Sequence, residues 1–113
     1  MSVSHVTTHI LDTAAGTPAA GVAVELYARD GDTWSTIATG KTDADGRVKD
    51  LGPERLASGD YRLHFATGPY FAGIKTDTFF PEVVLTFTVA QSEAHYHVPL
   101  LLSPFAYSTY RGN

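Results

Sequence analysis

The sequence of 113 residues contains no cysteine, so no disulfide can stabilise the folded chain. A chain without cysteine fits a reducing compartment, and we expect a cytoplasmic protein. The first residues carry no basic segment followed by an apolar run, so we expect no secretory signal peptide. Apolar runs are also too short for a membrane-spanning helix, and we expect no membrane partner.

Positive charge is scarce as well, with 8 Lys and Arg against 12 Asp and Glu. The basic residues are scattered along the chain, which argues against a nucleic-acid partner. With 43% hydrophobic and 18% charged residues, the composition is that of a globular protein rather than a disordered one. The length predicts a single domain over residues 1–113.

Two common catalytic motifs are missing from the sequence. No Gly-x-Ser-x-Gly segment is present, so a serine nucleophile on a strand-to-helix elbow is not supported. No glycine-rich phosphate loop is present either, which leaves nucleotide-binding enzymes of that kind without support.

What the sequence does contain is alternation of apolar and polar residues, the pattern typical of strands. It predicts strands over 3–11, 22–27, 34–42, 60–66, 82–89, 94–102 and 105–111. Glycine, proline and aspartate mark a loop over 12–21 and a turn over 43–46, and we expect a second turn over 91–93. A short helix fits only within 68–76. The pattern predicts an all-β fold: a two-sheet β-sandwich of about eight strands with one short helix.

Three histidines are predicted to point away from the sandwich core. Along 94–102, Tyr96 and Val98 share the core face, which leaves His95 and His97 on the other face. His9 lies on the outer face of the first strand by the same alternation. Such histidines can be ordinary surface residues, proton carriers, or the three ligands of a catalytic Zn²⁺ site. The sequence offers no supporting carboxylate at a recognisable spacing, so we expect no metal while the zinc alternative stays open.

Arg47 directly follows the turn at 43–46. An arginine in this position is either a solvated charge or a clamp for planar oxygens, because a guanidinium presents forked donors. The polar tail from Tyr107 to Asn113 runs directly out of an apolar strand, so the strand can hold it in place.

These residues occur in segments that resemble the transthyretin-like family, and within it the 5-hydroxyisourate hydrolases. The resemblance spans essentially the whole chain. It is carried by HILDTAAGTPAAGVAVELY, GKTDADGRV and HYHVPLLLSPFAYSTYRGN. Its most specific parts are His9 in THILD, Arg47 in DGRV, His97 in HYHVPLLLSP, and Tyr110-Arg111-Gly112. Hormone-carrying transthyretins are similar in fold but lack that ending.

The resemblance implies a homotetramer with active sites where two dimers meet. It implies catalytic roles for His9, Arg47 and His97. It implies substrate contacts from His9, Arg47, Tyr110 and Arg111, with Arg111 shaping the site from the tail. The implied reaction opens the ring of 5-hydroxyisourate to 2-oxo-4-hydroxy-4-carboxy-5-ureidoimidazoline in urate degradation, without a metal or organic cofactor.

Some features and alternatives stand beside that assignment. Members of the family usually end in Ser after Tyr-Arg-Gly, whereas this chain has Asn113, so a role for a terminal hydroxyl is not carried over. His5 and His95 share strand faces with the predicted catalytic pair, and we expect them in solvent or at an interface. The other possible functions are a non-catalytic carrier of an aromatic ligand and a structural sandwich module.

Overall fold

Alternating residues do form strands in the computed structural model, which describes residues 4–90 and 94–112. Within those residues, no helix is long and apolar enough to cross a membrane. The elements follow in the order β1 (Val6–Asp12), β2 (Thr17–Pro18), β3 (Ala23–Asp30), β4 (Thr33–Lys41), β5 (Arg47–Val48), β6 (Gly59–Phe65), α1 (Thr67–Gly73), β7 (Val83–Val89), β8 (Tyr96–Ser103) and β9 (Ala106–Thr109).

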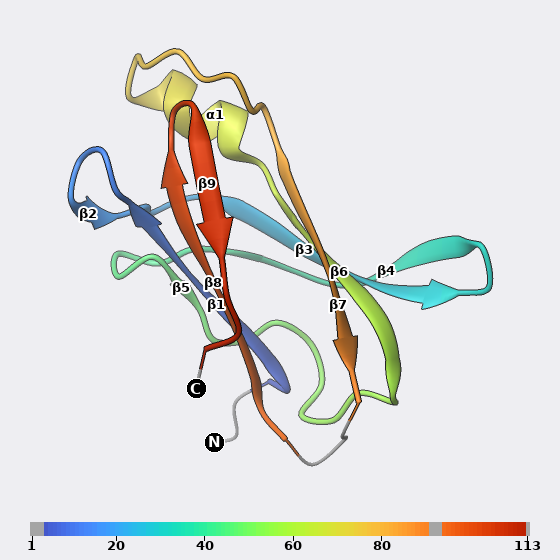
Figure 1. Ribbon diagram of the computed structural model, residues 1–113. Coiled ribbons are helices and arrows are strands. Elements are labelled where there is room, and N and C mark those ends of the chain that lie inside the picture. The colour runs from blue at the N-terminus through green and yellow to red at the C-terminus, as the bar shows by residue number, and fades with distance from the viewer. Residues whose placement is uncertain (1–3, 91–93, 113) are drawn as a thin grey trace.

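The strands form two sheets that face each other (Figure 1). One sheet has the order β4-β3-β6-β7, and every neighbouring pair in it is antiparallel. The other has the order β2-β1-β8-β9, with β5 pairing along β1. In this second sheet β1 and β8 run parallel, which joins two strands that are far apart in the sequence. In the resulting sandwich, β4 and β7 are the edges of the first sheet, and β2 and β9 end the order of the second.

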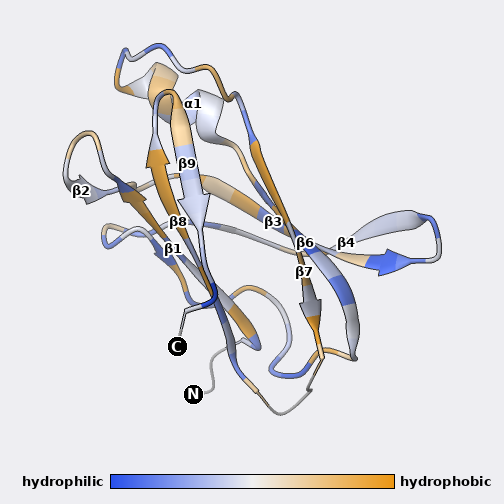
Figure 2. Cartoon of the chain, in the orientation of Figure 1, coloured by the Kyte–Doolittle hydropathy of each residue, from blue (hydrophilic) through white to orange (hydrophobic). Residues whose placement is uncertain are grey.

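The core lies between the sheets and is built from every second residue of the longer strands. Hydrophobic segments recur along β1, β3 and β8, as Figure 2 shows. The largest fully buried side chains include Phe65 of β6 and Phe71 of α1, which are 0% and 1% exposed. Burying a side chain of this size stabilises the fold by about 1.5–3 kcal/mol. The core positions therefore determine which residues are left on the outer faces.

The predicted fold class is confirmed: two sheets and one short helix. The structure corrects several predicted boundaries. Strand β1 begins at Val6, so residues 4 and 5 of the predicted strand 3–11 are not part of it, and residue 3 lies outside the described residues. Strand β9 ends at Thr109 rather than at residue 111. Strand β2 lies inside the predicted loop, and β5 was not expected as a strand; each is only two residues long, too short to show alternation. The turn predicted over 91–93 lies outside the described residues.

The expectation that His5 lies in solvent or at an interface is wrong. Its side chain is buried, at 3% exposure, and its ring packs 5.5 Å from that of Tyr96. The backbone N–H of Leu56 donates to Nδ1 at 2.8 Å, and Nε2 bonds to the carbonyl of Ala94. His5 precedes β1, so the alternation of the strand does not extend to it, and these partners satisfy its ring inside the fold.

Candidate active site

The outer face of the β2-β1-β8-β9 sheet gathers the predicted catalytic residues. In the register of the strands, His9 of β1 lies opposite Arg47 of β5. Thr7, two residues earlier in β1, lies opposite His97 of β8. Between them, Thr8 and Val98 are buried in the core. Since side chains alternate along a strand, Thr7, His9, Arg47 and His97 all belong to the outer face.

The turn before β5 fixes the position of Arg47. The carboxylate of Asp43 accepts the backbone N–H of Asp45 at 2.9 Å and that of Arg47 at 3.0 Å. The hydrogen bond from Arg47 is the main reason why the pKa of the Asp43 carboxyl lies below its usual value. Gly46 has a φ of +75°, and a Cβ there would collide with the carbonyl of Ile10. The backbone is thereby fixed, while the Arg47 side chain remains exposed.

His97 is held from two sides. Its Nδ1 lies 2.9 Å from the hydroxyl oxygen of Thr7. The backbone N–H of Gly112, in the tail, donates to the His97 carbonyl at 2.8 Å. A Cβ on Gly112 would lie 2.7 Å from Cδ2 of the His97 ring, so the tail approaches the ring as closely as only glycine allows. The tail is therefore held against the strand, as the sequence suggested.

The pKa of His97 lies below its ordinary value. Partial burial is the largest cause, followed by the positive charge of Arg47 and the charges that His9 and His95 would carry. A hydrogen bond with the backbone of Thr7 acts in the opposite direction. His97 is thus kept neutral at neutral pH, the form in which a ring nitrogen can accept a proton.

A shallow pocket of about 270 Å³ lies at this point, and its walls include Thr7, Arg47, Lys49, His95 and His97. No carboxylate occurs among the described residues that line it. Two permanent positive charges face a small cavity in a chain whose net charge is −4. This arrangement favours a small ligand rich in carbonyl or anionic oxygens.

The three-histidine metal site that the sequence left open has no counterpart here. Within residues 4–90 and 94–112, no group of three or more His, Cys, Asp or Glu side chains is placed to hold a metal ion.

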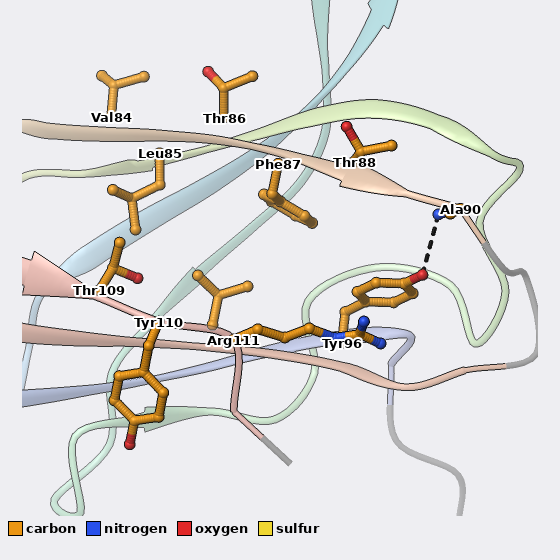
Figure 3. Close-up of a pocket in the computed structure, with 11 residues that line it drawn as sticks. Val84, Leu85, Thr86, Phe87, Thr88, Ala90, Tyr96, Thr109, Tyr110 and Arg111 are labelled. Atoms are coloured by element: carbon orange, nitrogen blue, oxygen red, sulfur yellow. Dashed lines mark hydrogen bonds between the residues drawn. The ribbon is translucent and has the colours of Figure 1, made fainter.

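The two tail residues predicted to contact substrate, Tyr110 and Arg111, both border a pocket other than the one at His97. The Arg111 guanidinium is 4.4 Å from the centroid of the Tyr96 ring, on the core side. It lines a separate, mostly apolar pocket of about 430 Å³ between β7 and β9 (Figure 3). Figure 3 shows the Tyr110 ring turned away from Arg111 and Tyr96. The structure therefore does not bring Arg111 to His97, and a role for it at the substrate stays a prediction.

Asp12, at the end of THILD, has a structural task. It is buried, and its carboxylate accepts the backbone N–H groups of Ala14 and Ala15 at 3.1 and 3.0 Å. The hydroxyl of Tyr70 donates to it at 2.7 Å. Burial, this hydrogen bond and the charge of Asp12 raise the pKa of Tyr70 to about 12. Asp12 therefore joins the end of β1 to α1 and the following loop.

Sequence reasoning missed two residues that hold the site, Thr7 and Gly112. Thr7 shares the outer face with His9, a signal that alternation alone provides. Its contact with His97 depends on the parallel pairing of β1 and β8, which no local pattern reveals. Gly112 was noted as part of the tail motif, but its closeness to the His97 ring became visible only in the structure.

Comparison with known proteins identifies the family. The model of the HIUase/Transthyretin family matches residues 6–112. The chain belongs to this family. A relative from Salmonella dublin named 5-hydroxyisourate hydrolase is 53% identical over 106 residues, which cover 93% of this chain and 78% of the relative.

Solved structures of the HIUase/Transthyretin family agree with the fold. The Klebsiella pneumoniae 5-hydroxyisourate hydrolase superposes with a TM-score of 0.84 at 38% identity, covering 99% of this chain and 100% of the other. Sea bream transthyretin in complex with thyroxine superposes with a TM-score of 0.88 at 37% identity. The match covers 95% of this chain and 93% of the transthyretin. The resemblance seen in the sequence is therefore confirmed at the level of the family.

Proposed function

We propose that this chain hydrolyses 5-hydroxyisourate and opens its ring to 2-oxo-4-hydroxy-4-carboxy-5-ureidoimidazoline in urate degradation. The observation that carries the proposal is the convergence of His9, Arg47 and His97 on one outer face, beside a small pocket without carboxylates. Relatives at about half identity named 5-hydroxyisourate hydrolase support the same substrate.

The residues can perform this reaction without a cofactor. A neutral histidine accepts a proton from water, and the hydroxide that forms adds to the carbonyl of the cyclic amide. Arg47 donates hydrogen bonds to the oxygen on which negative charge develops. The C–N bond of the amide then breaks and a histidine returns the proton to the leaving nitrogen. The new carboxylic acid of the product ionises by releasing its proton to water. His9 and His97 share these two roles, and Tyr110 orients the substrate from the tail.

The test is direct. Purified protein is added to the fresh product of urate oxidase, and the ultraviolet absorbance of 5-hydroxyisourate is followed. We expect its decay to exceed the spontaneous rate in proportion to protein concentration. Decay at the spontaneous rate, with a folded protein, would refute the proposal.

A carrier function is the second candidate, because the chain is also similar to a transthyretin solved with thyroxine. A carrier needs a binding cavity but no proton carrier, so His9, Arg47 and His97 would have no common task in it. Equilibrium dialysis with an iodinated aromatic ligand distinguishes the two functions. Binding without any hydrolysis would favour the carrier.

We further propose that the chain forms the homotetramer implied by its family. Phe79 and Phe105 are 72% and 69% exposed, and the N–H of Phe79 donates to Pro104 in the β8–β9 turn. Two exposed phenylalanines so close together are costly in water and suit a subunit interface. Light scattering at micromolar concentration should give four times the chain mass, and a monomer would contradict this proposal. A cytoplasmic location likewise stays a prediction.

A further inference from the structure

The hydroxyl of Thr7 lies between two histidine rings. Its oxygen is 2.9 Å from Nδ1 of His97 and 3.0 Å from Nε2 of His95. Thr7 is only 9% exposed, whereas His95 is exposed. We propose that Thr7 is a positioning residue that fixes the tautomer of His97, so that Nε2 of this ring is the nitrogen offered to the substrate. The inference rests on the proposed hydrolysis for its catalytic consequence.

Counting protons shows why the hydroxyl constrains the rings. A threonine hydroxyl has one hydrogen to donate and two lone pairs that accept. It can therefore donate to one ring nitrogen only, and the other nitrogen must carry its own hydrogen to make the second bond. Two arrangements satisfy this count, since Thr7 can donate to either ring. We infer the one in which Thr7 donates to Nε2 of His95 and the Nδ1–H of His97 donates to Thr7, because it leaves Nε2 of His97 without a hydrogen, as the base in the proposed hydrolysis requires. Nε2 of His97 then has a free lone pair and can act as a base.

This arrangement also suits the step that follows. When Nε2 of His97 takes the proton from water, the ring becomes a cation and its Nδ1–H still donates to Thr7. No proton on Thr7 has to move. Thr7 is too buried for water to replace its hydroxyl freely, whereas water can take the place of exposed His95. Thr7 should therefore matter more to the reaction than His95.

The charges around His97 define the pH effect to expect. Arg47 of β5, His9 of β1 and His95, which precedes β8, oppose a positive charge on the ring, and Lys49 lines the same pocket. The hydrogen bond with the Thr7 backbone favours the charged ring and is kept in Thr7→Val. In the proposed arrangement the Thr7 hydroxyl accepts from the charged ring as well and favours it further. Without that hydroxyl, the acid limb of the rate profile should move to lower pH.

The neighbouring threonine gives a matched control. Thr8 is 1% exposed, and its hydroxyl donates to the backbone carbonyl of Val98 on the core side. Thr7→Val and Thr8→Val remove the same group from adjacent positions. Only the first removes it from a histidine.

The experiment compares Thr7→Val, Thr7→Ser and Thr8→Val with the wild-type protein. We expect Thr7→Val to lower kcat by about ten- to a hundredfold, as loss of an orienting partner does for metal-bound histidines, with little change in KM. Thr7→Ser should restore most of the rate, because it keeps the hydroxyl. Thr8 also borders the pocket, but its hydroxyl bonds to Val98 rather than to a histidine. Thr8→Val should therefore lower the melting temperature and cost much less in kcat than Thr7→Val, with no shift of the pH profile.

A measurement independent of catalysis completes the test. Nitrogen NMR shifts of the histidine rings in the full protein report which nitrogen is protonated. His97 should carry its hydrogen on Nδ1 in the wild type and lose that preference in Thr7→Val. An unchanged tautomer, or equal losses of kcat in the Thr7 and Thr8 valine variants, would overturn the inference. An inactive wild-type protein would refute the proposed function alone, since the NMR comparison would still decide the role of Thr7.

Discussion

Replacing Arg47 with alanine tests the proposed oxyanion contact most directly. The backbone N–H that donates to Asp43 is kept in the variant, so the turn at 43–46 should form as before. The side chain of Arg47 is exposed, and exposed substitutions usually change the free energy of unfolding by less than about 0.5 kcal/mol. A loss of rate in Arg47→Ala can therefore be attributed to chemistry rather than to folding.

The size of the loss follows from the role assigned to the guanidinium. Removing one donor that stabilises a developing oxyanion costs about 2.7–4 kcal/mol, or roughly a hundred- to a thousandfold in kcat. Arg47→Ala should also change the pKa of His97 in a known direction. The charge of Arg47 contributes to the low pKa of His97, so its removal should let that pKa rise. The acid limb of the residual activity should therefore move to higher pH.

The assay is the initial decay of 5-hydroxyisourate above its spontaneous rate, measured across pH, with the melting temperature of each variant. Arg29→Ala is the matched control: it removes a guanidinium from β3 in the other sheet, where Arg29 pairs with Asp60 at 3.5 Å. Arg47→Lys keeps the positive charge but loses the paired N–H donors of the guanidinium. It should therefore keep the pH profile and recover only part of the rate. If Arg47→Ala stayed within tenfold of the wild type, or matched Arg29→Ala, Arg47 would not be the oxyanion contact.

Other variants and treatments test the remaining parts of the site. Removing a positioned proton carrier in His9→Ala or His97→Ala should lower the rate by about a hundred- to ten-thousandfold, whereas His95→Ala should cost less than about tenfold. Because the lowered pKa of His97 keeps it neutral, the wild-type acid limb should lie below the usual histidine value of about 6.5; a limb above 6.5 would contradict its role as base. Overnight treatment with EDTA should leave the activity unchanged, and loss of activity that Zn²⁺ restores would favour a metal site. Gly112→Ala should displace the His97 ring and lower kcat while the melting temperature stays nearly constant; an unaffected kcat would show that the close approach is unimportant.

Local patterns predicted a large part of this structure because strands and tight turns depend on neighbouring residues. The alternation in 94–102 placed Tyr96 inside and His97 outside, and both placements are confirmed. The Asp-rich turn before Arg47 forms as expected.

Other features depend on pairing between distant segments, which periodicity does not encode. The parallel register of β1 and β8 brings Thr7 beneath a histidine 90 residues later in the chain. His5 is buried because Leu56 and Ala94, from two other parts of the chain, supply partners for its ring. These contacts are properties of the assembled sandwich, and only a three-dimensional structure reveals them.

The sandwich itself does not decide between an enzyme and a carrier, because its structural relatives include both. Its core is built from residues such as Phe65 and Leu100, which no proposed chemical step uses. The proposed chemistry lies on the outer face of one sheet. It depends on three local features: the turn that presents Arg47, the threonine that bonds to His97, and the tail glycine that packs against the same ring. The residues of these features can be substituted without altering the core side chains. The functional distinction within this family should therefore be sought in these outer-face residues, which the Arg47 and Thr7 variants examine.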